Sequence, residues 1–397
     1  MHEIIHIQLG ECGNRIGSKF WNCIFDEHCI DSTGIYFDQS DLCRDRIHTY
    51  FDQTSDGKYR PRAILADFDP DMMNSIRNSS VGKQFPSDQM IIAGEYSCAS
   101  NWGVGYCLQN VELADLVSNK IRQQVELCDN LQGFQMTHSL IGGTGSGFGS
   151  FILNQLRDEY PDRLIMTFSC LSSSEIPERV IEPYNIVLGL HHLIENCDSS
   201  CLFDNETLLK RRLSSTFEDL NQIIANVISG ITTCFRFPDQ INGDMRKFTT
   251  YSSPYIRLHF LTSSLTPMLS LSLSELRKQM FDNTNLMMPC NFQQGQCHAM
   301  TSIFRGQISL QKIDEYFPDS KTTFCRVPLK EFERSLTMIG NHMGMKEIFQ
   351  RFLEKFTAMF RRKLYIFGLC RSGLDEMEFT EAENNLNDLI DEYQSIE

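Results

Sequence analysis

Two stretches of the sequence combine glycines with side chains suited to holding an anion. The first, QLGECGNRIG at residues 8–17, follows an apolar run at 4–7 and opens a segment with apolar residues at Ile16 and Phe20. This pattern predicts a strand, a tight turn and the start of a helix, where unpaired N–H groups and the helix dipole attract anions. Glu11 nevertheless puts a negative charge into this turn, where it would repel a bare phosphate.

The second stretch, SLIGGTGSGFG at residues 139–149, lies between a predicted strand (133–140) and a predicted helix that begins near Gly147. Its glycines let the backbone approach a pyrophosphate closely, and Thr144 and Ser146 add hydroxyl donors. The Lys of a Walker A loop is missing, and the position in the chain does not fit a dinucleotide fingerprint. The stretch predicts a phosphate site, and the alternative is a flexible turn with tight strand–helix packing.

The elements around these stretches alternate between strands and helices up to about residue 207. Predicted strands lie at 63–66, 134–140 and 164–168, and predicted helices at 113–127 and 148–160. Such alternation is typical of a doubly wound α/β fold with a parallel sheet.

The rest of the chain predicts a linking helix and two further parts. One apolar stripe runs through 217–231, with Gly230 near its expected end. A smaller α/β or α+β region has predicted strands at 256–261, 299–303 and 323–327. Two C-terminal helices follow, one at 345–360 and one that opens with the capping box of Thr380 and Glu383. The predicted domains are therefore 1–207, 208–342 and 343–397.

Composition excludes several classes of function. The 397 residues carry a net charge of −15, and nine Asp or Glu but no Lys or Arg lie in 374–397. Nucleic-acid and anionic-membrane binding need basic patches, so neither is expected, and no apolar run could span a bilayer. The 15 scattered cysteines show no CxxC pair, and the N-terminus does not resemble a signal peptide. We therefore expect reduced thiols and a cytoplasmic location.

The glycine stretch also carries a resemblance. HSLIGGTGSGFG resembles the tubulin signature, in which a third Gly normally stands at Ile141. The resemblance continues in the family's order over essentially the whole chain, and within the family it points to the β branch. The other segments that carry it are QLGECGNRIG, KYRPRAILADFDP, NWGVGY, LRDEYPDRL, EPYN, CFRFPDQIN, KFTAMFRRK and DEMEFTEAENNLNDLIDEY.

This resemblance implies a site for GTP or GDP. Asn205 and Asn221 would hydrogen-bond the edge of guanine, since an amide can both donate and accept. Phe217, where the family usually has Tyr, would stack on the base, and Glu178 and Glu182 would accept hydrogen bonds from the ribose. The residues implied around the turns and phosphates are Glu11, Cys12, Arg15, Asn101, Ser139, Gly143, Thr144 and Gly145.

A Mg²⁺ ion is implied beside the phosphates. Asp69 would reach it, with Asp67 behind, and Glu11 is a second candidate ligand. Glu11 and Arg15 both stand where the family has Gln. Three explanations for Glu11 remain open: it binds Mg²⁺ with Asp69, it pairs with Arg15 one helical turn later, or it stays protonated.

The resemblance also implies a shared hydrolytic step. In the family GTP lies at a head-to-tail interface, and the next subunit supplies an acid that positions water. Lys247 stands at the acid's place here, as in β-tubulins, and a protonated Lys cannot act as a base. Asn242, Asp244 and Lys247 would therefore face the nucleotide of an α-tubulin partner, and the chain would not be an autonomous GTPase. Tubulin-folding chaperones and a place in the microtubule cytoskeleton are implied as well.

Several departures favour a specialised role. The loop TSSLTPMLSLSLSEL is shorter than the family's lateral-contact loop and lacks its basic and aromatic residues. Residues are also missing before Phe217, and the chain stops at Glu397 without the family's acidic tail. Shortened loops remove contact area without destroying a core. A β-tubulin-like subunit of microtubules is one interpretation, and a non-polymerising regulatory or capping subunit is the alternative.

Overall fold

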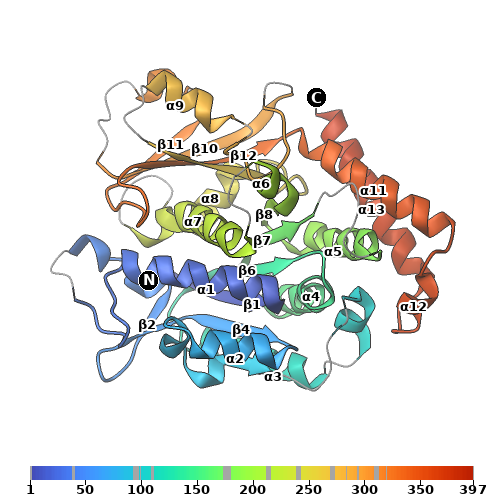
Figure 1. Ribbon diagram of the computed structural model, residues 1–397, viewed down its shortest axis with the longest axis horizontal. Helices are drawn as coiled ribbons and strands as arrows, with labels where there is room; N and C mark the ends of the chain where they lie inside the picture. Colours follow the sequence, from blue (N-terminus) through green and yellow to red (C-terminus); the bar gives the residue numbers. More distant parts are fainter. Residues whose placement is uncertain are drawn as a thin grey trace.

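A computed structural model gives the fold of the chain (Figure 1). It describes residues 2–37, 41–92, 98, 100–108, 111–172, 180–211, 216–237, 243–268, 273–282, 284–292, 295–307, 313–318 and 320–396. Among these residues no helix has both the length and the apolar character needed to cross a membrane.

One large sheet runs through the described part of the chain. Its ten strands lie in the order β11-β10-β12-β9-β8-β7-β6-β1-β4-β5, and β2 and β3 form a separate hairpin. The run from β9 to β5 is parallel, whereas β12 pairs antiparallel with both β9 and β10. The strands are β1 (Glu3–Leu9), β2 (Phe51–Gln53), β3 (Tyr59–Pro61), β4 (Ala63–Asp67), β5 (Met90–Ile92), β6 (Leu131–Ser139), β7 (Leu164–Leu171), β8 (Ser199–Asp204), β9 (Phe260–Pro267), β10 (Cys297–Arg305), β11 (Lys321–Cys325) and β12 (Ser335–His342).

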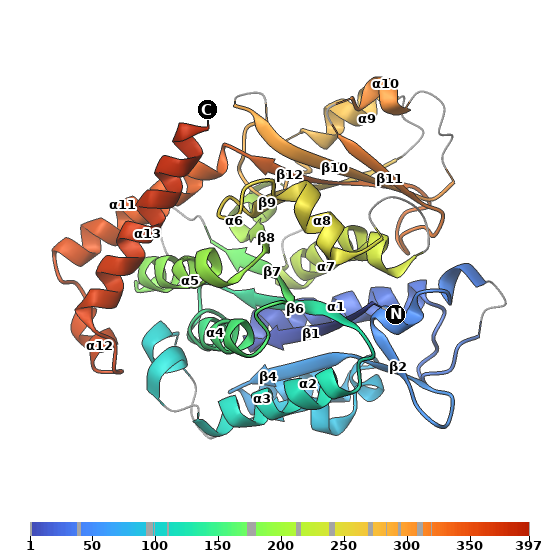
Figure 2. The same ribbon diagram turned by 180° about the vertical axis from the view of Figure 1, so that it is seen from behind.

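Helices cover both faces of the sheet, as Figures 1 and 2 show from opposite sides. The α-helices are α1 (Gly10–Glu27), α2 (Pro70–Asn78), α3 (Val111–Glu126), α4 (Gly149–Glu159), α5 (Glu182–Asn196), α6 (Asn205–Arg211), α7 (Phe217–Arg236), α8 (Met245–Ser252), α9 (Leu273–Met280), α10 (Ile313–Tyr316), α11 (Met345–Arg361), α12 (Ile366–Cys370) and α13 (Glu376–Ser395). A π-helical turn at Gly143–Phe148 precedes α4.

The strands separate two cores by alternating their side chains. Along β1, Ile4 joins the core beneath α1 and α7, whereas Ile5 and Ile7 join the core beneath α4, α5 and the C-terminal helices. This period of two is what a strand buried on both faces requires. A third cluster lies where α9 and α10 cover β10 and β12. The predicted doubly wound α/β fold, with a mostly parallel sheet and C-terminal helices, is confirmed.

Two predicted helix ends were wrong. The linking helix α7 continues through Gly230 to Arg236. Gly230 is needed inside the helix, because a Cβ there would lie 2.2 Å from Thr337 Oγ1 of β12. The capping box at Thr380 is also wrong, since α13 begins a turn earlier, where Asp375 caps it by accepting a hydrogen bond from the Met377 amide.

Two predicted strands were misplaced by a few residues. The strand expected at 256–261 runs from Phe260 to Pro267, because Ile256 is 93% exposed and lies before the sheet. The strand expected at 323–327 is β11, which ends at Cys325.

Candidate functional site

The sheet reverses its direction of winding at β1. From β1 the chain adds β4 and β5 on one side, while β6, β7 and β8 lie on the other. Open α/β sheets bind ligands at such a point, beyond the carboxyl ends of the strands. The turns after β1 and β6 meet there, because a Cβ on Gly10 (φ +72°) would lie only 3.2 Å from the amide nitrogen of Gly145. The two glycine stretches singled out in the sequence are therefore neighbours.

A buried histidine, His138, fixes the turn at Gly143–Phe148. His138 Nδ1 donates to the carbonyl of Gly145 at 2.7 Å, so Nε2 accepts from Ser169 Oγ at 2.8 Å. Burial lowers the pKa of His138 to about 4, which keeps the ring neutral and this pattern intact at neutral pH. A fixed turn leaves its backbone preorganised for a ligand.

Asn185 links this turn to the loop after β5. Its amide nitrogen donates to the carbonyls of Ser100 (2.6 Å) and Ile141 (2.7 Å), and its oxygen accepts from the Trp102 amide at 3.1 Å. The side chain is fully buried in α5. Sequence reasoning missed this residue, and the only signal was an amide within the apolar helix pattern that follows Glu182.

The loop after β5 lies directly against the glycine turn. A Cβ on Gly143 would lie 2.7 Å from the Asn101 carbonyl oxygen, and the Asn101 side chain accepts from the Gly103 amide. Ser100 has φ +60°, a left-handed conformation that favours glycine. Ser100 therefore has a backbone conformation typical of glycine, although it carries a side chain.

Glu11 and Arg15 form an ion pair on the first turns of α1. Arg15 Nε donates to Glu11 Oε1 at 3.0 Å, and Nη2 lies 2.8 Å from the same oxygen. The Arg15 and Glu11 side chains are 45% and 62% exposed. Of the three explanations for Glu11, the structure contains the pairing with Arg15.

Two further carboxylates lie at or just after the end of β4, the strand next to β1. Asp69 caps α2 by accepting hydrogen bonds from the amides of Asp71 (2.9 Å) and Met72 (3.4 Å). Asp67 is 3% exposed, its Oδ1 accepts from the Phe68 amide, and its Oδ2 has no partner among the described residues. Burial, followed by the charges of Asp69 and Glu11, raises the pKa of Asp67 to about 7.

This donor set fits a Mg²⁺ ion that shares its ligands with a nucleotide. The orphaned buried carboxylate oxygen of Asp67 suits a hard divalent cation. Across the described residues, no group of three or more His, Cys, Asp and Glu is arranged to hold a metal by itself. Phosphate and water oxygens would therefore have to complete the coordination.

The residues predicted around the base lie at the ends of β8 and α7. Asn205 is the first residue of α6, whose cap is supplied by Asp204, which accepts from the Thr207 amide. Phe217 opens α7 and is 57% exposed, whereas Asn221 is buried one turn later. An ion pair between Lys19 and Glu218 (2.5 Å) holds this end of α7 against α1.

The remaining predicted contacts lie beside the first turn of α1 and after β7. Cys12 is half-buried and its thiol hydrogen-bonds that of the buried Cys170. Glu182 is buried in the first turn of α5, and Glu178 lies outside the described residues. Ser139 ends β6, where its hydroxyl accepts from the Ile141 amide at 3.2 Å.

As a group, the residues predicted to bind the nucleotide lie near the carboxyl ends of the strands. The predicted residues found at this edge or at the adjoining start of α7 are Glu11, Cys12, Arg15, Asp69, Asn101, Ser139, Gly143, Thr144, Gly145, Glu182, Asn205, Phe217 and Asn221.

Asp244 and Lys247 lie at the opposite edge of the sheet. Asp244 caps α8 by accepting from the Lys247 amide at 2.7 Å, and the Met245 amide donates to Gln132 Oε1 at the start of β6. From Gln132 to Ser139 the strand covers roughly 23 Å at about 3.3 Å per residue. Lys247 is exposed, and Asn242 lies outside the described residues. These residues therefore do not join the glycine-turn site of their own chain.

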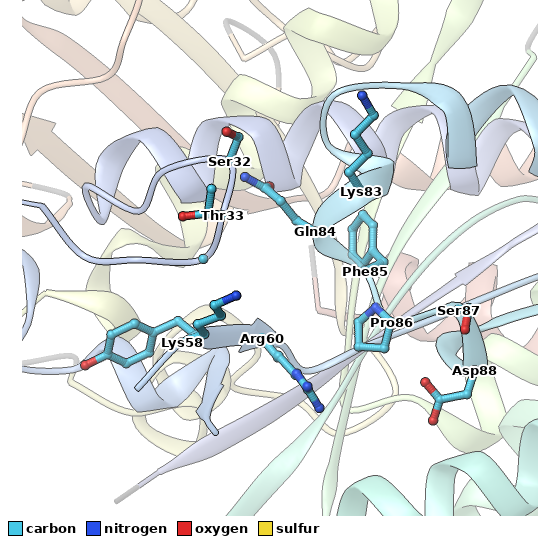
Figure 3. Close-up of a pocket in the computed structure, with 12 residues that line it drawn as sticks. Ser32, Thr33, Lys58, Arg60, Lys83, Gln84, Phe85, Pro86, Ser87 and Asp88 are labelled. Carbon is cyan, nitrogen blue, oxygen red and sulfur yellow. The ribbon is translucent and has the colours of Figure 1, made fainter. Parts of the chain in front are cut away.

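A separate cavity of about 570 Å³ lies away from these turns. Figure 3 shows Lys58 and Arg60 of the β2–β3 hairpin facing Gln84, Phe85 and Pro86 across it. None of the predicted site residues lines this cavity, so its size does not make it the candidate site.

Comparison with known families adds independent findings. Residues 3–212 match the family model described as Tubulin/FtsZ family, GTPase domain. Residues 256–324 match the model described as Tubulin C-terminal domain. The first match spans more than half of the chain and includes both glycine turns.

Proposed function

The chain belongs to the Tubulin/FtsZ family as a GTP-binding member, and we propose that it is a β-tubulin-like subunit that pairs head-to-tail with α-tubulin in microtubules. The observation that carries this proposal is the separation of two functional edges on one sheet. The glycine turns lie at the carboxyl ends of the parallel strands, and Lys247 lies at the amino end of β6. A subunit built this way can hold its own nucleotide at one end and face its neighbour's at the other.

Exposed apolar side chains at both ends support stacking of this kind. Tyr365 and Phe367 are 56% and 82% exposed next to the loop after β5, where Asn101 donates to Ser372. Figures 1 and 2 both draw α12 far from the N-terminus. Tyr255 and Ile256, 44% and 93% exposed, follow α8 at the other end. Two different patches make a heterologous contact, which generates open filaments where the rotation between subunits does not close into a ring.

The division of labour in hydrolysis follows from the charges. Lys247 can stabilise the phosphates of a neighbouring nucleotide but cannot act as a base. We propose that an α-type subunit supplies the acid for GTP bound here, so that hydrolysis needs assembly. Mg²⁺ at Asp69 and Glu11, a cytoplasmic location in the cytoskeleton and folding by tubulin chaperones belong to the same proposal.

GTP is expected to protect Cys12 from alkylation. Cys12 is half-buried at the first turn of α1, and a nucleotide above that turn would cover it. With GTP at about ten times Kd, N-ethylmaleimide should modify Cys12 roughly tenfold more slowly, because mainly the unliganded chain reacts. Mass spectrometry of labelled peptides measures this. Cys29, half-buried just beyond the other end of the same helix, is the control, and equal protection of both cysteines would contradict a local site.

Substitution of the two apolar patches tests the head-to-tail proposal. Ile256→Glu should weaken the pairing with α-tubulin, since it lies at the edge that would face the partner's nucleotide. Phe367→Glu should leave that pair intact and block addition of the next subunit. We expect each effect to be about 2 kcal/mol, roughly thirtyfold in affinity, as for a central interface residue.

The measurement is co-purification with α-tubulin followed by polymer sedimentation. Leu116→Glu, at a 44% exposed position on α3 away from both patches, is the control for a simple charge effect. If Ile256→Glu and Phe367→Glu reduced the same step equally, the assignment of the two ends would be wrong.

One observation favours the alternative, a non-polymerising capping or regulatory subunit. Only residues 268–272 separate β9 from α9, which leaves few residues for a lateral contact. Residues 269–272 lie outside the described part of the chain. A heterodimer that binds GTP but lowers polymer mass in the sedimentation assay would identify this alternative.

A further inference from the structure

We propose that Glu11 exchanges between two partners, Arg15 and the divalent cation beside the phosphates. The inference rests on the proposed function, because it requires a nucleotide at the turn after β1. It makes nucleotide retention depend on the divalent cation more steeply than neutral side chains at positions 11 and 15 would.

The geometry of the Glu11–Arg15 ion pair allows it to break easily. Two nitrogens of Arg15, Nε and Nη2, lie 3.0 and 2.8 Å from a single oxygen of Glu11, Oε1. The pair spans one helical turn and both side chains are more than two-fifths exposed. Exposed pairs of this spacing contribute little to stability, so exchange of one partner for another costs little.

The carboxylates of Asp67 and Asp69 favour a cation as the second partner of Glu11. Asp67 Oδ2 is buried and has no hydrogen-bond partner among the described residues, although Asp67 lies at the end of β4, next to the end of β1. Asp69, two residues later, directs one oxygen to two backbone amides of α2. Leu9 of β1 pairs with Ala66 of β4, so Glu11 and Asp67 lie at or just after the ends of two neighbouring strands. Such a group repels phosphate alone and attracts a divalent cation.

The exchange changes which charge lies near the phosphates. While the pair is closed, Arg15 neutralises Glu11 and limits its repulsion of an incoming nucleotide. When Glu11 turns to the cation, the Arg15 guanidinium is released, and a guanidinium suits phosphate oxygens. Loss of the cation would reverse both steps and weaken the hold on the nucleotide.

Neutral variants of the two residues test this exchange. The readout is the Kd of radiolabelled GDP for the full chain, with its α-type partner where the two co-purify, in excess Mg²⁺ and in EDTA. The ratio of Kd in EDTA to Kd in Mg²⁺ should fall about tenfold in Glu11→Gln, a change of about 1.4 kcal/mol. It should rise about tenfold in Arg15→Gln, because the unpaired Glu11 then repels the phosphates unless the cation is present.

The double variant Glu11→Gln/Arg15→Gln separates the exchange from independent effects. Its ratio should lie near that of Glu11→Gln, since Arg15 acts on the cation dependence only through Glu11. Both positions are exposed, so unchanged melting midpoints are expected for all four proteins.

The possible outcomes are distinct. Opposite shifts in the two single variants support the exchange. Unchanged ratios, or shifts in the same direction, overturn it while leaving nucleotide binding in place. A wild-type chain that binds no GDP in either condition would overturn the proposed function itself.

Discussion

Glu27→Gln is expected to lower the free energy of unfolding by about 3–5 kcal/mol, because it leaves two buried arginines without their counter-charge. Glu27 Oε2 lies 2.6 Å from Arg236 Nη1, and Oε1 lies 3.1 Å from Arg305 Nη1. Both guanidinium groups are completely buried, and the carboxylate is 2% exposed. Removing one partner of a buried ion pair destabilises the fold far more than the intact pair stabilises it, because the remaining charges stay buried without a counter-charge.

The network joins three parts of the fold. Glu27 ends α1, Arg236 ends α7, and Arg305 ends β10. Ser229 Oγ donates to Glu27 Oε1 at 2.7 Å, and Arg305 also donates to the carbonyls of Val327 and Pro328. The variant should therefore weaken the packing of α7 against the second half of the sheet. Its effect should not be confined to the end of α1.

The pH dependence has a definite sign. Burial alone would raise the pKa of Glu27, but the charges of Arg236 and Arg305 lower it from 4.5 to about 2. A depressed carboxylate pKa contributes stability that is complete above the unfolded value and is lost as pH falls toward the folded value. The difference in stability between the wild type and Glu27→Gln should therefore be constant near neutral pH and shrink as pH falls from about 4.5 toward 2.

Thermal or urea unfolding of both proteins across this pH range measures the effect. Asp26→Asn is a matched control, because Asp26 is the preceding residue and also pairs with a cation, Lys330. That pair is 44% and 64% exposed, so the control should change stability by less than about 1 kcal/mol. Equal losses in the two variants would show that burial of the network does not govern its energy.

The sequence alone predicted the strands that form apolar runs and the turns that need an unusual backbone conformation. Apolar runs indicated β4, β6 and β7 to within a few residues, and the glycine stretches indicated the turns that meet at Gly10 and Gly145. These predictions succeed because strands buried on both faces need apolar runs, and left-handed or crowded backbone positions restrict residue type locally.

Long-range polar contacts could not be predicted in the same way. His138, Asn185 and Glu27 each gain their role from partners in other elements, and nothing within a few residues of them distinguishes a satisfied polar group from a surface one. The capping box at Thr380 failed for the opposite reason. Its local pattern was correct, but Asp375 offered an earlier cap and the apolar stripe allowed the helix to start there.

Asn185→Leu is the second substitution with a large expected effect, and it should lower nucleotide affinity by at least about a hundredfold. The leucine removes three hydrogen bonds and leaves the Trp102 amide and the carbonyls of Ser100 and Ile141 buried without that partner. Each such orphaned group costs about 1–3 kcal/mol, so the two loops can no longer hold their present positions without strain. A hundredfold loss of affinity corresponds to about 2.7 kcal/mol, which is within the cost of two such groups.

Asn196→Leu provides the control on the same helix. Asn196 ends α5 and its amide donates to Asn154 Oδ1 (2.7 Å) and to the His192 carbonyl (3.0 Å), so it also loses side-chain hydrogen bonds. It lies eleven residues from Asn185, roughly 16 Å along the helix. Both variants should lose stability, but only Asn185→Leu should lose affinity for GDP, measured by equilibrium binding below the melting temperature of each protein. If the two variants lost affinity in proportion to their stability, Asn185 would act as general packing and not as the anchor that positions the two loops.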